Sequence, residues 1–186
     1  PASCAPAAAN YQSDAVYGIL AANAALADSV ALFHSTHANL TGTGTAIAVT
    51  SLGVARTMMR KQKTIKNVVM NLRPRYLIVP AALETIAAQY VSANYVANQS
   101  STINPFAGAF EVISEARLDD NSATAWYLAA DPSMIDTIEY CYLEGQNGVY
   151  IETRQGFDVD GMEIKARLDF AAKAIDYRGL YKNVGA

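Results

Sequence analysis

Hydrophobic and charged residues alternate most regularly near the C-terminal end of the sequence, between residues 162 and 170. A period of two predicts a strand with one buried and one solvated face. Asp160-Gly161 favours a two-residue hairpin turn, since both residues tolerate positive φ. We therefore predict that residues 149–159 pair with residues 162–170, with a bend at Ala171-Ala172. The residues predicted to face a core are Met162, Ile164, Ala166, Leu168 and Phe170, and those predicted to face solvent are Glu163, Lys165, Arg167 and Asp169.

The rest of the pattern predicts mainly helices in the first half and strands in the second, which is an α+β fold. Residues 1–10 are predicted to be a mobile tail. Helices are predicted from Ser13 to Ala24, from Thr50 or Ser51 to Lys66, and from Pro80 to Val91. A short buried strand is predicted at residues 75–79. Further strands are predicted at residues 109–118, 124–130 and 137–143.

Charge is unevenly distributed along the chain. No Asp or Glu occurs between Ser29 and Leu83, yet residues 56–75 hold seven of the 14 lysines and arginines. The predicted helix at residues 51–66 would carry Arg56, Arg60 and Lys63 on one face. Such asymmetry indicates a surface that meets phosphate or an acidic patch on another copy of the chain. A hydrophobic content of 52% with only 17% charged residues also favours an oligomer.

Candidate chemistry is sparse. His34 and His37 are spaced so that a helix could direct both at one metal, with Asp28 as a third ligand, but the glutamate of a catalytic zinc helix is missing. Residues 158–161 begin like a calcium loop, but the residues that follow favour the hairpin. Cys4 and Cys141 lie far apart and are interpreted as reduced thiols. We predict no catalytic residues, no cofactor and no resident metal.

Several segments, in the same order along the chain, resemble the major capsid proteins of tailed bacteriophages and prophages. The similar subgroup is the Mu-like head subunit, often encoded as the capsid half of a fusion to a Clp-type prohead protease. Asp28-Ser29 departs from the Asp-Gly expected there. The segments are LADSVALFHSTHANL (26–40), SLGVARTMMRKQK (51–63), LRPRYLIVPAALE (72–84), NPFAGAFEVISEARL (104–118), AWYLAADPSMIDTIEYCYL (125–143) and YIETRQGFDVDGMEIKARLDFAAKAIDYRGLYKN (150–183).

The resemblance implies the Hong Kong 97-type capsid fold. Residues 1–70 and 153–186 would form a peripheral domain, with a spine helix at 51–66 and a long ribbon at 149–170. Residues 71–152 would form an axial domain. It also implies an N-terminal arm and an extended loop, which this sequence is expected to lack. The protein would be made in the bacterial cytoplasm and reside in the virion capsid, with copies of itself as partners and packaged double-stranded DNA on the inner surface.

The charge asymmetry then gives a contact hypothesis. Arg56, Arg60 and Lys63 would meet acidic residues of the adjacent subunit, since heterologous contacts pair unlike surfaces. The facing acids would be Glu139, Glu144 and Glu152. Two other classes stay open from the residues alone: a metal-binding or enzymatic domain that uses His34 and His37, and a nucleic-acid-binding module that uses residues 51–66.

Overall fold

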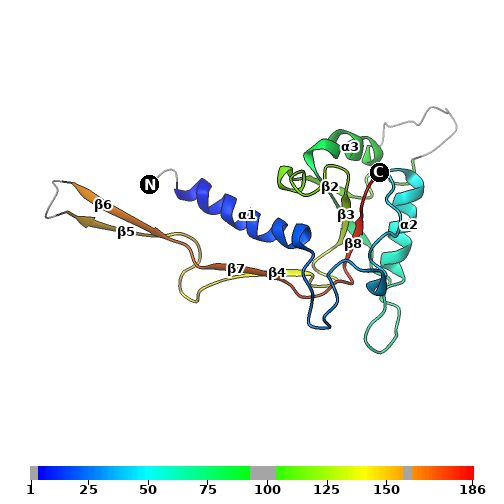
Figure 1. The fold of residues 1–186 in the computed structure, drawn as a ribbon, viewed down its shortest axis with the longest axis horizontal. Coiled ribbons are helices and arrows are strands. Elements are labelled where there is room, and N and C mark those ends of the chain that lie inside the picture. The colour runs from blue at the N-terminus through cyan, green and yellow to red at the C-terminus, as the bar shows by residue number, and fades with distance from the viewer. Residues whose placement is uncertain (1–3, 93–103, 157–160) are drawn as a thin grey trace.

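The computed structural model describes residues 4–92, 104–156 and 161–186. It consists of a body built around a four-stranded sheet and a long arm of paired strands that extends away from that body (Figure 1). Mixed helices and strands make it an α+β protein, as predicted from the sequence.

The sheet of the body has the strand order β2-β1-β3-β8. Its first central strand, β1 (Pro74–Val79), pairs in parallel with β2 (Glu111–Ser114) and antiparallel with β3 (Trp126–Ala130). The edge strand β8 (Leu180–Asn183) pairs antiparallel with β3, with Leu128 opposite Tyr181. All five residues of β3 are buried, because helices or loops cover both faces of this strand.

The two faces of the sheet hold two hydrophobic cores. The α2 (Val49–Arg60) and α3 (Glu84–Val91) helices cover one face, and the end of α1 (Cys4–Ala22) covers the other. Alternate residues of β3 point to opposite sides, as the strand period requires. The first core contains Leu52, Ala55, Met59, Leu77, Val79, Phe106, Trp126, Leu128 and Tyr181; the second contains Leu20, Leu32, Phe33, Leu118, Tyr127, Ala129 and Leu180.

The arm consists of two successive antiparallel ladders. Nearest the body, β4 (Ile138–Tyr142) pairs with β7 (Phe170–Ala174). Farther out, β5 (Tyr150–Gln155) pairs with β6 (Met162–Arg167), and this outer hairpin is called the distal ribbon below. Three short 3-10 helices, η1 (Ser35–His37), η2 (Ala81–Leu83) and η3 (Ala116–Leu118), lie within the connections of the body.

The α1 helix joins the body to the arm. It packs against β7, and Figure 1 shows it running beside the β4–β7 ladder. Arg117 of η3 holds it in place, through an ion pair with Asp14 and a 3.2 Å hydrogen bond to Asn10 Oδ1. Tyr11 lies edge-on to the Phe170 ring, with centroids 6.5 Å apart. The helix therefore covers one face of the inner ladder.

The start of the chain differs from the sequence prediction. Residues 4–10 are the first turns of α1, not a mobile tail, and the helix begins at Cys4 rather than at Ser13. Four alanines in this segment have the highest helix propensity, and Pro6 is tolerated in a first turn because the N–H it lacks would have no partner there. Local composition thus supports a longer helix than hydrophobic periodicity indicated.

The second helix, in contrast, ends earlier than predicted, since α2 ends at Arg60 and not at Lys66. Ser51 does help to start it: its Oγ, at the third helical position, accepts a 2.9 Å hydrogen bond from the Ala48 N–H. Beyond Arg60 the chain turns into a hairpin that the periodicity did not predict. The predicted third helix is present as η2 followed by α3, directly after Pro80.

The predicted strands are largely present, with two corrections. The segment at 109–118 is a strand only over Glu111–Ser114, because Ala116–Leu118 form η3. The predicted ribbon is interrupted at Leu168 and Asp169, where the chain changes its partner from β5 to β4, so Ala171-Ala172 lie inside a strand and not at a bend. Residues 157–160, which include the end of the predicted first strand and Asp160 of the predicted turn, lie outside the described residues.

The predicted burial of the ribbon is wrong for its outer half. Met162, Ile164 and Ala166 do share a face, but all three are exposed, because the described chain does not cover this face of the distal ribbon. Leu168 and Phe170 are half-buried. The period of two correctly predicted which residues share a face, but it could not predict whether other segments pack on that face.

Phe170→Ala is expected to destabilise the arm more than a change on the distal ribbon. The Phe170 ring contacts Tyr11, Tyr140 and Tyr142, so its loss should lower the free energy of unfolding by about 2 kcal/mol, less than the ~3–5 kcal/mol of a fully buried ring. Lys165→Ala, on the exposed ribbon, should cost under about 0.5 kcal/mol. Urea unfolding of both variants measures the difference, and equal costs would contradict this description of the arm.

Candidate subunit-contact surfaces

The hairpin of residues 61–70, called the basic hairpin below, is an ordered projection of the body. Lys63 and Val69 form an antiparallel bridge, and the Thr64 N–H donates to the Val68 carbonyl at 2.8 Å. Asn67 adopts a φ of 62°, a left-handed conformation that asparagine tolerates better than most residues. Figure 1 shows this hairpin projecting below α2, far from the end of the arm.

Buried contacts fix the base of the basic hairpin. The side chain of Gln62 is buried, and its Nε2 donates to the His37 carbonyl at 2.8 Å. The Arg178 Nε donates to the Lys63 carbonyl at 2.9 Å. The tip, in contrast, is apolar and open to solvent: Ile65 is 92% exposed. Since its base is fixed and its tip uncovered, the hairpin presents a preformed apolar and cationic surface.

Most of the lysines and arginines between residues 56 and 75 form no ion pair within the described chain. Arg60 and Lys63 are exposed, and neither forms an ion pair within the described residues; the same holds for Lys61, Lys66 and Arg73. The third predicted contact residue differs, because Arg56 lies over the Phe106 ring at 4.6 Å and is only half-exposed. Arg60 and Lys63 are therefore the freer of the three predicted cations.

The three predicted acids are all on the arm, and they too differ from one another. Glu139 and Glu144 are exposed, and no ion pair of the described residues includes them. Glu152 is paired across the distal ribbon with Lys165, at 3.5 Å. Free negative charge on the described arm is thus found at Glu139 on β4 and at Glu144 just beyond it.

The distal ribbon has two chemically different faces. Cross-strand partners share a face, so one face carries Arg154 with Glu163 and Glu152 with Lys165 as ion pairs. The opposite face, called the apolar ribbon face below, has no charge at all. It consists of Ile151, Thr153, Gln155, Met162, Ile164 and Ala166, all of them exposed.

The histidines predicted as possible metal ligands have separate structural surroundings. His37 is buried and stacked on Tyr177, with ring centroids 3.7 Å apart, and its Nε2 lies 2.8 Å from an Asp28 carboxylate oxygen. This contact lowers the pKa of Asp28. His34 is exposed and bonds to Thr36 of the same turn. Within residues 4–92, 104–156 and 161–186, no three His, Cys, Asp or Glu side chains are grouped to hold a metal.

Asp131 lies between the end of β3 and the start of the arm, where it forms an ion pair with Arg75. Its lowered pKa predicts that this ion pair is lost in acid. A hydrogen bond from the Ser133 N–H and the ion pair with Arg75 lower this pKa from 3.8 to about 2. Because the pKa is lower in the folded state, the contact stabilises fully above about pH 4 and is lost as the pH falls through about 2. Asp131→Asn should make the urea midpoint depend less on pH across this window. Asp136→Asn, which removes a nearby exposed carboxylate, should leave the dependence unchanged; an equal effect would contradict the assignment.

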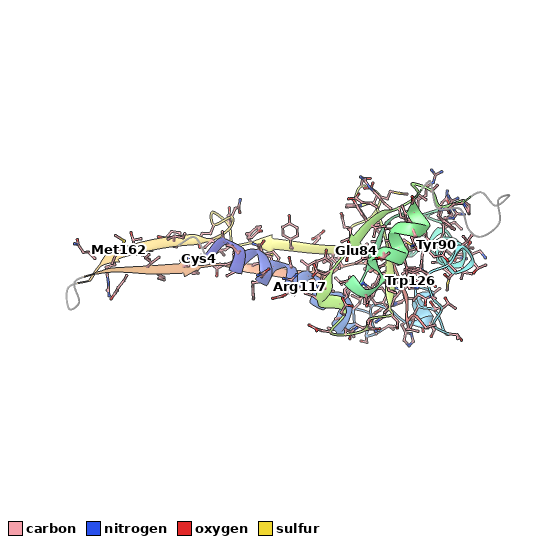
Figure 2. The ribbon with its side chains drawn as sticks, turned by 90° about the horizontal axis from the view of Figure 1, so that it is seen from above. Cys4, Glu84, Tyr90, Arg117, Trp126 and Met162 are labelled. Atoms are coloured by element: carbon pink, nitrogen blue, oxygen red, sulfur yellow. The ribbon has the colours of Figure 1, made fainter. Side chains whose placement is uncertain are left out.

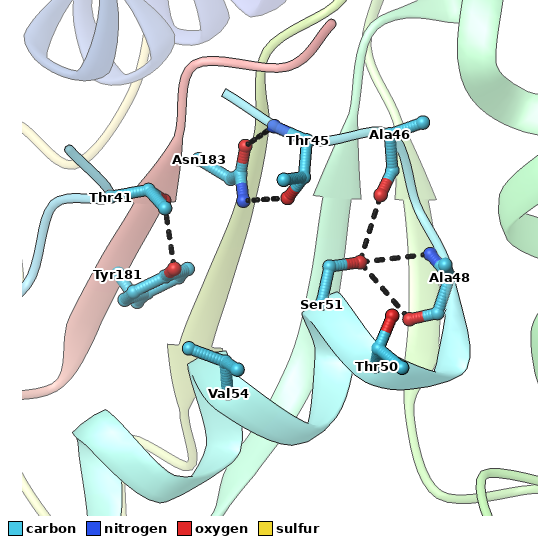
Figure 3. Close-up of a pocket in the computed structure, with 9 residues that line it drawn as sticks. All are labelled: Thr41, Thr45, Ala46, Ala48, Thr50, Ser51, Val54, Tyr181 and Asn183. Carbon is cyan, nitrogen blue, oxygen red and sulfur yellow. Dashed lines mark hydrogen bonds between the residues drawn. The ribbon is translucent and has the colours of Figure 1, made fainter. Parts of the chain in front are cut away.

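A groove with a volume of about 440 Å³ lies between the start of α2 and β8 (Figure 3). Its lining consists of apolar and hydroxyl side chains and one amide, that of Asn183, and no acid, imidazole or thiol takes part. Tyr181 hydrogen-bonds to Thr41 at 2.8 Å, and burial raises the pKa of its phenol. The groove therefore lacks a general acid, a base or an activated nucleophile. It is lined by Thr41, Thr45, Ala46, Ala48, Thr50, Ser51, Val54, Tyr181 and Asn183.

Sequence reasoning missed the basic hairpin as a projection and the apolar ribbon face as an open surface. The Thr64 and Asn67 turn residues were a local signal for the first, because both favour turns over helix interiors. No local signal exists for the second, since exposure depends on what the rest of the chain covers. None of the described helices is long and apolar enough to span a membrane.

The comparisons with known proteins identify the family of the chain. Among curated proteins, none matches the sequence significantly. A family model described as phage capsid protein matches residues 1–183, which is nearly the whole chain. Capsid proteins are structural components of the virion and assemble with other capsid subunits. The chain therefore belongs to the phage capsid protein family.

Proposed function

We propose that this chain is the major head subunit of a tailed phage or prophage, and that its copies assemble into the icosahedral shell that encloses double-stranded DNA. The observation that carries the proposal is the arm. Its distal ribbon has an apolar face that no part of the described chain covers, on a subunit of a capsid family. An isolated two-stranded hairpin is marginally stable in water, so cover from a neighbouring subunit would stabilise it.

The finer assignment is part of the same proposal: a Mu-like head subunit with the Hong Kong 97-type fold. The packing favours domain boundaries at the junction of body and arm over those at residues 70/71 and 152/153. The β8 strand, from the predicted peripheral segment, pairs with β3 of the predicted axial segment. The α1 helix is the one that runs beside the arm, so it is a better candidate for the spine helix than α2.

Four exposed charged residues are the best candidates for contact between subunits. Arg60 and Lys63 on one subunit would face Glu139 and Glu144 on its neighbour, because these four have no ion pair in the described chain. Arg56 and Glu152 would contribute less, since each is already engaged within its own subunit. Contact with packaged DNA is the second candidate role of the same cations, which have no acid around them in sequence.

Electron microscopy of the intact gene product tests the proposal. We expect rings or closed shells in the purified protein or in lysates of expressing cells. A product that stays monomeric at every concentration, and that binds DNA as a discrete complex, would support the nucleic-acid-binding module instead. Stoichiometric metal that is lost on His37→Ala would support the metal-binding class.

A further inference from the structure

The basic hairpin is an unusual surface for a chain without a partner. Three apolar side chains gather on it: Ile65 at 92%, Val68 at 61% and Val69 at 57% exposure. Its backbone is nevertheless ordered by its own hydrogen bonds and by the buried Gln62. A preformed apolar tip loses little conformational entropy on binding, which is typical of a docking element.

The apolar ribbon face also exposes apolar side chains that nothing in the described chain covers. Ile151, Met162 and Ile164 are 46%, 70% and 45% exposed. They share one face of the ribbon, Ile151 on β5 and the other two on β6. This face is flat and uncharged, while the opposite face is occupied by its own ion pairs. An occupant of the apolar face must therefore supply apolar side chains.

Charge complementarity selects the occupant. Residues 60–75 contain six cations and no acid, whereas residues 138–174 contain seven acids and four cations, a net charge of −3. The apolar ribbon face itself is uncharged, so the attraction acts between the cations of the hairpin and free acids elsewhere on the same arm, Glu139 and Glu144, whereas two hairpins would place like charges together. The hairpin projects from the bottom of the body in Figure 1, whereas the arm extends to the left and ends far from it, so the two do not meet within one chain.

We propose that the basic hairpin of one copy docks on the apolar ribbon face of a second copy. The inference rests on the proposed capsid function and specifies which surfaces meet. Ile65, Val68 and Val69 would cover Ile164 and its neighbours, and the lysines of the hairpin would lie near the free acids of the arm. Such a contact is heterologous, so the first copy keeps an unused ribbon and the second keeps an unused hairpin. The contact can therefore propagate around a ring or through a shell.

Disulfide trapping between two differently substituted chains tests the docking. Cys4 and Cys141 are first replaced by serine; then Ile65→Cys in one chain and Ile164→Cys in another place single thiols on the two surfaces. We expect a disulfide-linked dimer on oxidation of the mixture. Lys165→Cys is the matched control, because it lies next to Ile164 on β6 but on the charged face, and it should not cross-link. Adding Val68→Asp and Val69→Asp to the Ile65→Cys chain should abolish the dimer, since the contact would then desolvate carboxylates.

Three results would overturn the docking. A disulfide-linked dimer of Ile164→Cys chains alone would show that two ribbons meet face to face. An equal yield of dimer with Lys165→Cys would show that the chains collide without docking. If no dimer forms at all, the hairpin and the ribbon do not bind each other. Circular dichroism of each variant checks its fold, which these exposed sites should not alter. The proposed capsid function is tested separately. If the unmodified protein forms shells but the cysteine variants do not cross-link, the capsid function stands and the docking is wrong. If the variants cross-link but the unmodified protein forms no rings or shells, only the capsid function is wrong.

Discussion

Trp126→Ala is expected to lower the free energy of unfolding by about 3–5 kcal/mol, the largest single-residue loss in the body. Trp126 is fully buried on β3, between α2 and the sheet, and its ring lies 6.0 Å from that of Tyr181 on β8. Its Nε1 also donates a 3.0 Å hydrogen bond to the Thr45 carbonyl. The substitution leaves a cavity and an unpaired carbonyl at the same point.

Urea unfolding followed by circular dichroism measures this loss, with two variants for comparison. Trp126→Phe keeps much of the ring volume but not the donor, so it should cost less than alanine and report on the hydrogen bond. Met162→Ala, at the far end of the arm and 70% exposed, should cost under about 0.5 kcal/mol. Figure 2 shows both positions, Trp126 inside the body and Met162 near the tip of the arm. Similar costs at the two sites would contradict the described core.

Arg60→Glu combined with Lys63→Glu is expected to block assembly of the intact gene product. The double change reverses two free cations on the surface proposed to meet a neighbour's acids. Each exposed pair contributes only about 0–1 kcal/mol, but the contact repeats at every interface of a shell, so small losses accumulate. Assembly of the unmodified protein should also weaken with added salt, because the charges are exposed. Electron microscopy and light scattering measure the yield of particles.

A reciprocal exchange separates subunit contact from DNA contact. Adding Glu139→Lys and Glu144→Lys to the Arg60→Glu and Lys63→Glu variant should restore part of the yield of particles. Every copy then carries opposite charges on both contact surfaces. Arg60→Lys with Lys63→Arg keeps the charge and should assemble normally. Normal particles that package DNA poorly in the charge-reversed variant would contradict the subunit contact and support the nucleic-acid role.

Local sequence patterns were sufficient for several parts of this protein. The alternation through β6 correctly grouped Met162, Ile164 and Ala166 on one face, since successive side chains of any strand point to opposite sides. The apolar run that forms β1 and the proline before η2 were also located correctly. The charge asymmetry is a property of the sequence itself, and the structure only assigns its members to α2, the basic hairpin and the start of β1.

Local patterns failed where the outcome depended on distant residues. Periodicity extended α2 to Lys66, but the buried Gln62 contact with the His37 backbone holds the chain in a hairpin instead. The pairing of β8 with β3 joins residues more than 50 positions apart, and nothing in the short segment 180–183 specifies that partner.

The sequence by itself thus determined which side chains share a face, where charge accumulates and that the fold is α+β, because each follows from backbone geometry or composition. The tertiary structure alone decided which of those faces is covered. The α1 helix covers one face of the inner ladder of the arm, whereas the apolar face of the distal ribbon is left exposed within the described chain. Burial depends on contacts between segments far apart in the chain. A strand therefore has the same alternating sequence whether its apolar face packs on its own core or stays exposed for another copy.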